Sequence, residues 1–335
     1  MKIIVPMAGR GSRLRPHTLT TPKPLIPIAG KPIVQRLIED LIAVCGTNVE
    51  EIAFVIDRSF GEEVENDLRE ITSKLGTACS LHYQDEKLGT AHAILMAESA
   101  LEGNVLVAFA DILFKADFKL DLNQEGIVWV QKVDNPSAYG VVKYDSNNVI
   151  TDFVEKPEEF VSDLAIIGIY YFKDGEYLKN ELQYLIDNDI RIKGGEFGLT
   201  DALENMKNKG TKLIHGEVQE WLDCGNKEVT IHTNSRYLTY LDEKELISPS
   251  ATTENSVIIP PVYLGKNVII ENSIIGPNVS IGDNTKVSGS IINNSLIQSG
   301  TLIGNAQLSN SMVGKHANVK GKSDDLSIGD YCTVR

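Results

Sequence analysis

The chain has 335 residues, 42% of them hydrophobic and 23% charged, and a formal net charge of −14. This length is enough for a large core and suggests two domains, while the acidic balance argues against nucleic-acid binding because no broad basic surface is available. Apolar runs of membrane-spanning length and a signal-peptide core are both missing, so we expect a cytoplasmic protein that does not bind membranes. The four cysteines form no C-x-x-C pair and indicate neither a disulfide framework nor a zinc site.

The first 111 residues alternate between apolar strand-like runs and helical patterns. Pro32 can open a helix that Gly46 ends, and Thr90 can cap another helix that runs to about residue 101. The predicted order is strand 2–7, helix 33–45, strand 52–56, helix 61–75, strand 80–84, helix 90–101 and strand 105–110. This alternation predicts a mostly parallel sheet under helices, with ligands bound at the carboxyl ends of the strands.

From about residue 127 the pattern changes to strands and hairpins, followed by helices. The predicted strands are 127–133, 139–144, 149–155, 165–172 and 213–219, and the predicted helices are 174–188, 200–208 and 226–242. Residues 243–256 are polar, contain Pro249 and several Ser or Thr, and are typical of a linker. We therefore expect one domain over 1–242.

The last segment, 257–335, repeats pairs of an aliphatic residue and glycine, and its aliphatic residues recur six positions apart. Ile258, Leu264 and Ile270 show this spacing. A six-residue period with abundant Asn predicts a short left-handed parallel β-helix; an ordinary β-sandwich is the alternative. Because a short solenoid leaves an apolar end or edge uncovered, we expect a homo-oligomer formed through this segment.

The first 36 residues contain seven Lys or Arg and no Asp or Glu. Glycines in this segment allow backbone N–H groups to approach phosphate oxygens, and the basic side chains supply countercharge. A dinucleotide-binding turn is not indicated, because Leu14 stands where a third small residue is required and the following prolines forbid a long helix. The segment therefore predicts an extended clamp for several phosphates.

This segment resembles the N-terminal motif of the sugar-1-phosphate nucleotidyltransferases. The matching residues run Gly9-x-Gly11-x-Arg13-Leu14-x-Pro16-x-Thr18, then Pro22-Lys23-Pro24-Leu25-x-Pro27-Ile28-x-Gly30-Lys31-Pro32. The family often has two adjacent glycines and a Thr in this loop, where this chain has Ala8-Gly9 and Ser12. The resemblance covers residues 1 to about 230 and implies an α/β fold, a Rossmann-like mixed-sheet nucleotidyltransferase domain followed by the β-helix.

The resemblance also implies roles for individual residues. The expected nucleotide-binding residues are Ala8, Gly9, Gly11, Ser12, Arg13, Gln84, Gly89 and Thr90. The expected sugar-phosphate-binding residues are Gly140, Glu155, Lys156 and Gly168, with Thr200 and Asp201 as further candidates. The expected catalytic residues are Arg13, Lys23 and Asp111, and Asp111 and Asp223 would bind Mg²⁺.

The implied reaction is attack of a sugar-1-phosphate oxygen on the α-phosphorus of a nucleoside triphosphate. The nucleophile is already an anion, so fixed cations and Mg²⁺ matter more than a general base. Arg13 suits a bidentate grip on the α- and β-phosphates, and Lys23 suits the α-phosphate. The amide of Gln84 suits a pyrimidine edge.

The predicted substrates are dTTP and glucose-1-phosphate. The alternatives within this reaction are UTP with glucose- or N-acetylglucosamine-1-phosphate and GTP with mannose-1-phosphate. A non-catalytic subunit that binds nucleotide sugar and an acyl-transfer activity of the β-helix are alternatives of other classes. An acyl-transfer activity would need a catalytic histidine, and His316 is the one histidine in residues 257–335. The six histidines show no metal-binding spacing and are expected to be core or surface residues.

Overall fold

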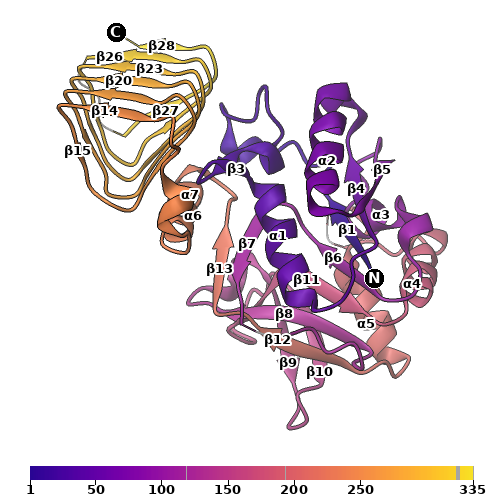
Figure 1. Cartoon of the computed structure of the whole chain (residues 1–335). Coiled ribbons are helices and arrows are strands. Elements are labelled where there is room, and N and C mark those ends of the chain that lie inside the picture. Colours follow the sequence, from indigo (N-terminus) through magenta and orange to yellow (C-terminus); the bar gives the residue numbers. More distant parts are fainter. Residues whose placement is uncertain (118, 193, 322–324, 335) are drawn as a thin grey trace. The chain divides into compact units, whose positions relative to one another are not determined.

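The computed structural model describes residues 1–117, 119–192, 194–321 and 325–334 (Figure 1). By its internal contacts the chain divides into two compact units. The first unit comprises Met1–Gly9 and Leu37–Trp221, and the second comprises Arg10–Arg36 and Leu222–Arg335. The basic N-terminal segment thus groups with the C-terminal part of the chain.

The first unit is built on a mixed nine-stranded sheet. Its order is β10-β9-β11-β6-β1-β4-β5, with β8 beside β11 and β12 beside β8. The strands are β1 (Lys2–Pro6), β4 (Glu51–Ile56), β5 (Ala78–Tyr83), β6 (Val105–Ala108), β8 (Gly126–Lys132), β9 (Gly140–Tyr144), β10 (Ile150–Glu155), β11 (Leu164–Phe172) and β12 (Leu213–Glu217). β1 is parallel to β4 and β6, whereas β11 is antiparallel to β6, β8 and β9. The α/β mixed sheet expected from the sequence is confirmed.

Helices of the lengths predicted from the sequence cover this sheet, with one exception. They are α1 (Ile33–Cys45), α2 (Gly61–Leu75), α3 (Thr90–Leu95), α4 (Gly175–Asp187) and α5 (Leu199–Asn208). α2 ends at Gly76, which has φ 72°, and Asp174 caps α4 by accepting a hydrogen bond from the Tyr177 N–H (2.9 Å). The prediction that the helix from Thr90 runs to residue 101 is wrong, because the α-helix ends at Leu95 and a 3₁₀ turn, η4 (Glu98–Ala100), follows.

Short elements connect these strands and helices. They are β2 (Pro27–Ile28), β3 (Lys31–Pro32), β7 (Ile112–Lys115), β13 (Glu220–Asp223) and the 3₁₀ turns η1 (Ser12–Leu14), η2 (Lys23–Leu25), η3 (Arg58–Phe60) and η5 (Pro136–Ala138). The Gln219 N–H donates to the Lys115 carbonyl oxygen (2.9 Å), so β13 begins beside the end of β7. No long helix forms in the proline-rich segment after Gly11, as the sequence predicted.

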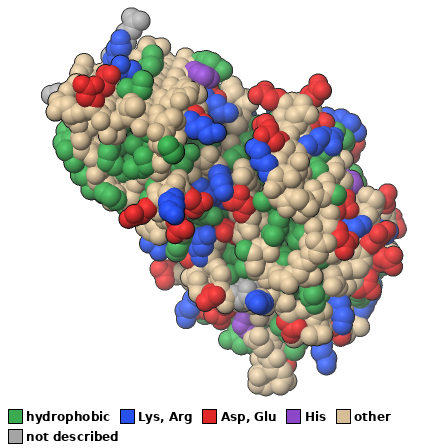
Figure 2. Space-filling view, viewed as in Figure 1, with side chains coloured by type: hydrophobic (Ala, Val, Ile, Leu, Met, Phe, Trp, Pro, Cys, Tyr) green, Lys and Arg blue, Asp and Glu red, His purple; other side chains and the backbone are tan. Residues whose placement is uncertain are grey.

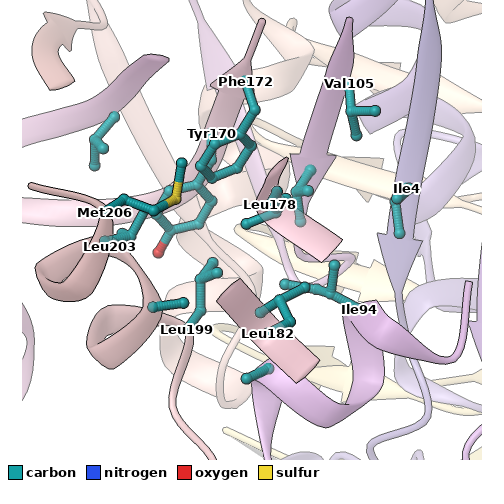
Figure 3. Packing of buried hydrophobic residues seen from close by; sticks show 14 of the residues in the cluster. Ile4, Ile94, Val105, Tyr170, Phe172, Leu178, Leu182, Leu199, Leu203 and Met206 are labelled. Carbon is teal, nitrogen blue, oxygen red and sulfur yellow. The ribbon is translucent and has the colours of Figure 1, made fainter. Parts of the chain in front are cut away.

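A hydrophobic cluster fills the space between the sheet of the first unit and helices α3, α4 and α5 (Figure 3). Tyr170 and Phe172 of β11 stack with ring centroids 6.5 Å apart and interplanar angle 16°. The labelled members are Ile4, Ile94, Val105, Tyr170, Phe172, Leu178, Leu182, Leu199, Leu203 and Met206. This packing holds α3 and α5, whose first residues belong to the candidate site, against a rigid sheet.

The second unit contains α6 (Lys227–Leu238), α7 (Glu243–Leu246) and a parallel β-helix with three faces. One face is β14 (Thr252–Glu254), β17 (Ile269–Glu271), β20 (Lys286–Ser288), β23 (Leu302–Gly304), β26 (Asn318–Lys320) and β28 (Thr333–Val334). The second is β15 (Val257–Ile258), β18 (Ile274–Ile275), β21 (Ile291–Ile292) and β24 (Gln307–Leu308). The third is β16 (Val262–Leu264), β19 (Val279–Ile281), β22 (Ser295–Ile297), β25 (Met312–Val313) and β27 (Ser327–Ile328).

The strand pairs described within these faces are all parallel, and aliphatic side chains stack inside, one per face in successive coils. Ile270 pairs with Val287, and Val287 pairs with Ile303. The parallel β-helix predicted from the hexapeptide rhythm is confirmed; its left hand stays a prediction. The coils begin at β14, inside the stretch 243–256 that was expected to be a linker, and α7 also lies in that stretch.

Asparagines with positive φ form the corners of the coils, where a left-handed backbone is required. Asn267 donates from Nδ2 to Oδ1 of Asn284 in the next coil (3.0 Å). On the outside of the second face, Val257, Ile274 and Ile291 form an in-register exposed ladder. Figure 2 shows hydrophobic side chains gathered on this side of the β-helix, at the left of the view. The homo-oligomer expected from the sequence would use such a surface and stays a prediction.

Candidate functional site

Gly11 shapes the basic loop of the second unit. It has φ 63° and ψ 42°, and its carbonyl oxygen accepts hydrogen bonds from the Leu14 N–H (3.0 Å) and the Thr18 hydroxyl (2.8 Å). A Cβ atom built on Gly11 would lie 2.7 Å from Cβ of Lys23, which real side chains do not tolerate. Glycine is therefore required here for two reasons, the left-handed backbone and the close approach of Lys23.

The basic side chains of this loop point to solvent. Arg10, Arg13 and Arg15 are exposed, whereas Leu14 is buried and anchors the turn. Among the residues that the structure describes, none forms an ion pair or hydrogen bond with the three guanidinium groups. Gly9 and Ser12 are also exposed, and Ala8 is buried beside them in the chain. The loop therefore presents uncompensated positive charge.

Lys23 differs from these arginines because it is buried, with 5% of its surface exposed. It begins η2, and its carbonyl oxygen accepts from the Ile26 N–H (3.0 Å). Its stem lies close to Gly11, since a Cβ on that glycine would also lie 3.2 Å from Cδ of Lys23. Lys23 is thus held in place by its backbone and its stem within the same unit.

Two buried side chains hold the turn between β2 and β3, directly after this loop. Oδ1 of Asn234 on α6 accepts from the Ala29 N–H (3.0 Å) and from the hydroxyl of Ser280 on the β-helix (2.7 Å). Arg36 donates to the carbonyl oxygens of Ile28 (2.8 Å) and Ala29, and its guanidinium lies 4.4 Å from the ring centre of Tyr237. The turn is therefore tied to α6 and to the coils.

The stretch after the loop also contacts the last coil of the β-helix. Nε2 of His17 lies 3.3 Å from the hydroxyl of Ser327, and the Thr20 hydroxyl donates to the Asp330 carboxylate. Burial lowers the pKa of His17 to about 4; nearby Asp330 raises it and Lys227 lowers it further, by smaller amounts. His17 is therefore a neutral imidazole at neutral pH, enclosed within the second unit.

In the first unit, three of the expected nucleotide-binding residues, Gln84, Gly89 and Thr90, lie close together. Gln84 follows β5, is 6% exposed, and its Nε2 lies 3.1 Å from the Gly89 carbonyl oxygen and 3.1 Å from Nδ1 of His92. Gly89 has φ 106°, and a Cβ there would lie 2.5 Å from the carbonyl oxygen of Phe197. This close packing places the Gly89 backbone at the start of α3.

A second strip of chain fixes the start of α3. The Phe197 N–H donates to the Leu88 carbonyl oxygen (2.7 Å), and the Ala91 N–H donates to the Phe197 carbonyl oxygen (3.0 Å). The Leu199 N–H donates to the hydroxyl of Thr90 (3.0 Å). The loop that carries Gly89 is therefore held by hydrogen bonds from both sides of Phe197.

The predicted sugar-side residues Gly140 and Glu155 are register partners on β9 and β10. A Cβ on Gly140 would lie 2.9 Å from Oε2 of Glu155, so the glycine makes room for this carboxylate. Lys156 has φ 43°, its N–H donates to the Tyr139 carbonyl oxygen (3.0 Å), and its ammonium lies 3.7 Å from Glu155 Oε1. Both charged side chains are exposed and can reach a ligand.

Gly168 and Asp201 lie on neighbouring elements of the same unit. Gly168 has φ 89° on β11, accepts from the Phe109 N–H (3.0 Å), and a Cβ there would lie 3.2 Å from the Phe109 ring. Burial, with smaller contributions from Glu155 and Glu204, raises the pKa of Asp201 in the first turn of α5. The influence of Glu155 on this pKa shows that Asp201 shares its surroundings.

The two expected metal ligands follow strands in different units. Asp111 of the first unit is partly buried between β6 and β7. Asp223 of the second unit ends β13; its carbonyl oxygen accepts from the Thr233 hydroxyl (2.6 Å), and Gly225 leaves space for its carboxylate. Within residues 1–117, 119–192, 194–321 and 325–334, no three His, Cys, Asp or Glu side chains gather as a metal-binding cluster. No described helix is long and apolar enough to span a membrane.

Sequence reasoning missed two polar residues that organise these sites. His92 lies in the stretch Leu88-Gly89-Thr90-Ala91-His92-Ala93, which resembles the base-binding stretch of the family, but it was expected to be a core or surface residue. Asn234 belongs to no motif that the residue pattern reveals. The role of Asn234 depends on Ala29 and Ser280, far away in the sequence, and no local pattern indicates it.

Comparisons with known proteins agree on one family. The family model described as Nucleotidyl transferase matches residues 2–239. "Bifunctional protein GlmU" of Methanococcus vannielii is 34% identical over 266 residues, covering 77% of this chain and 59% of that protein. The mannose-1-phosphate guanylyltransferase catalytic subunit beta of Drosophila melanogaster is 36% identical over 181 residues, 51% of this chain and 48% of the relative. The chain thus spans about three fifths of the length of the GlmU proteins it matches.

Two solved structures share the fold. A putative glucose-1-phosphate thymidylyltransferase from Bacillus anthracis has a TM-score of 0.61 at 24% identity, with 73% of this chain and 98% of that chain covered. A UDP-glucose pyrophosphorylase complexed with UDP-glucose has a TM-score of 0.58 at 27% identity, with 72% and 99% covered.

Proposed function

Because this chain belongs to the nucleotidyl transferase family, we propose that it transfers a nucleotidyl group from a nucleoside triphosphate to a sugar-1-phosphate. The observation that carries the proposal is the basic loop. Arg10, Arg13 and Arg15 are exposed and unpaired among the described residues, in a chain of net charge −14. Such uncompensated charge beside glycine backbone suits a polyphosphate.

In the proposed reaction, an oxygen of the sugar-1-phosphate attacks the α-phosphorus of the triphosphate. A new P–O bond forms, the bond between the α- and β-phosphates breaks, and pyrophosphate leaves with the electron pair. The nucleophile needs no deprotonation, so the protein's task is to position two polyanions and to stabilise charge on the leaving group. Arg13 would hold the α- and β-phosphates, and Lys23, fixed by its buried stem, would contact the α-phosphate.

Asp111 and Asp223 are proposed to bind Mg²⁺. Both offer hard carboxylate oxygens, and a Cβ built on Gly225 would lie 2.9 Å from Oδ2 of Asp223, so the glycine makes room for this carboxylate. Two carboxylates suit Mg²⁺, which usually takes one or two protein carboxylates together with substrate phosphates and waters. When bound, the ion would neutralise charge on the pyrophosphate.

The residues proposed to contact the base and the sugar phosphate all lie in the first unit. Gln84 and Gly89 are proposed to contact the base, with Thr90 nearby, and Glu155 with Lys156, Gly140 and Gly168 to contact the sugar phosphate. We propose dTTP and glucose-1-phosphate as the first substrate pair and UTP as the next triphosphate. The solved structure with UDP-glucose, at 27% identity, supports a pyrimidine nucleotide and a glucose moiety.

The test is release of pyrophosphate from dTTP, UTP, GTP, CTP or ATP with glucose-1-phosphate, N-acetylglucosamine-1-phosphate or mannose-1-phosphate and Mg²⁺. We expect turnover that EDTA abolishes and that Lys23→Ala lowers by about 10²- to 10³-fold, as loss of one transition-state contact does. Lys74→Ala is the matched control, because Lys74 is an exposed lysine that pairs with Glu70 on α2. Binding of nucleotide sugar without turnover of any pair would instead indicate a non-catalytic subunit and reject the enzyme.

A further inference from the structure

The side-chain amide of Gln84 is held in one orientation by two acceptors. Its Nε2 lies 3.1 Å from the carbonyl oxygen of Gly89 and 3.1 Å from Nδ1 of His92. A backbone carbonyl can only accept a hydrogen bond, so the amide nitrogen, not the amide oxygen, must face Gly89. Both hydrogens of the Gln84 amide are then used inside the protein.

His92 can accept the second of these hydrogen bonds because it is neutral. Burial lowers the pKa of His92, with a smaller opposing influence from Glu86, so the imidazole carries one proton at neutral pH. With Nδ1 facing the Gln84 amide, that proton resides on Nε2. His92 lies in α3, whose first turn is fixed by Phe197 and Leu199.

The polar atoms of Gln84 and Gly89 that are not used in these contacts determine which ligand groups can form hydrogen bonds here. Oε1 of Gln84 accepts no hydrogen bond from the residues that the structure describes, so its capacity as an acceptor is left for a ligand. The Gly89 N–H likewise donates to no acceptor in the described part of the chain. The site therefore offers one acceptor, Gln84 Oε1, and one donor, the Gly89 N–H.

We propose that His92 is a positioning residue that fixes the Gln84 amide with its oxygen toward the base and thereby selects the base. The inference rests on the nucleotide site proposed above. An acceptor beside a donor matches a base edge with a ring N–H beside a carbonyl, which uracil, thymine and guanine have. In the proposed arrangement, the ring nitrogen of the base lies opposite Gln84 Oε1 and its exocyclic group lies opposite the Gly89 N–H. In that register cytosine and adenine present an acceptor to the acceptor and an amino group to the donor, which leaves both protein groups unpaired.

Two substitutions separate this role from simple packing. His92→Asn keeps an acceptor, because Asn Oδ1 is bonded to Cγ as His Nδ1 is, whereas His92→Leu removes it and retains the apolar bulk. His92→Leu leaves Gln84 with one anchor, so the amide can rotate away from the base. We expect the KM for UTP and dTTP to rise about tenfold, the loss of one oriented hydrogen bond, with kcat within about twofold.

The measurement is steady-state pyrophosphate release with UTP, dTTP, GTP, CTP and ATP and glucose-1-phosphate. It is accompanied by calorimetric binding of each triphosphate, which needs no turnover. For His92→Leu, the preference for UTP over CTP should shrink about tenfold, and for His92→Asn both the preference and KM should stay near the unsubstituted protein. Melting temperatures test whether both variants fold.

Equal behaviour of the Leu and Asn variants would overturn the positioning role, as would a preference of the unsubstituted protein for CTP or ATP. If no triphosphate is turned over, the proposed function fails, and calorimetry still decides the base preference and its dependence on His92. The two failures are therefore distinguishable.

Discussion

Substitution of Gly11 by alanine tests whether the conformation of the basic loop controls the position of Lys23. An alanine at φ 63° costs about 1–2 kcal/mol in backbone energy. Its Cβ would lie 2.7 Å from Lys23 Cβ, against about 3.4 Å for an ordinary contact, so one of the two must move by 3.4 − 2.7, or about 0.7 Å. Such overlap adds about 1–3 kcal/mol.

We therefore expect Gly11→Ala to lower the free energy of unfolding by about 2–5 kcal/mol. We also expect kcat/KM to fall by about 10- to 100-fold, because a displacement of up to 1 Å at a catalytic group costs about that much. Pyrophosphate release and urea unfolding measure the two effects.

Gly76→Ala is the matched control. Gly76 has φ 72° at the end of α2, and no atom lies within 4 Å of a Cβ built there. The Gly76→Ala variant should therefore lose about 1–2 kcal/mol of stability from the backbone conformation alone, and its kcat/KM should stay within about twofold of the unsubstituted protein. If Gly11→Ala loses the same stability as Gly76→Ala and retains full turnover, the contact with Lys23 does not control the site.

Two further predictions concern residues that hold this loop. The pKa of His17 is lowered to about 4, so between about pH 6.5 and pH 4 the unfolded chain binds a proton that the folded protein does not, and the free energy of unfolding should fall by about 3 kcal/mol as the pH decreases through this range. His17→Gln should remove this part of the pH dependence in urea titrations; parallel curves for both proteins would contradict the assignment. Asn234→Ala should lower stability by about 2–3 kcal/mol and raise the KM for the triphosphate, because the Ala29 N–H and the Ser280 hydroxyl both lose their acceptor. Ser280→Ala, which removes one of these bonds, should cost about 1 kcal/mol, and an equal loss in both variants would refute the role of Asn234.

Proline and glycine at helix ends explain which helices the sequence predicts well. Pro32 and Gly46 bracket α1, and Gly76 ends α2, so the bounds of both helices follow from local chemistry. The end of α3 at Leu95 does not, because no Gly or Pro occurs between Leu95 and Gly103. Ala97 and Ala100 are fully buried in the core, and tertiary packing rather than local propensity ends the helix.

The coils and the candidate site likewise combine features that local sequence patterns predict with features that only tertiary contacts determine. Ile258 and Leu264 mark the coils through their six-residue spacing, whereas β14 is polar and exposed and is recognisable only by its pairing with β17. Gln84 and Gly89 are predictable because they belong to a family motif. The contact of Gln84 with His92 comes from the conformation of the loop between β5 and α3, which no short-range pattern encodes.

The contacts between the N-terminal segment 10–36 and the coils limit how chimaeras of such proteins can be designed. Ser280, Ser327 and Asp330 of the coils are partners of Asn234, His17 and Thr20. A chimaera spliced at residue 243, where the sequence pattern predicts a linker, would replace those three partners and leave the segment proposed to bind phosphate without them. A foreign C-terminal segment joined to this chain would therefore need residues 10–36 from its own source, or the two serines and the aspartate restored at the matching positions.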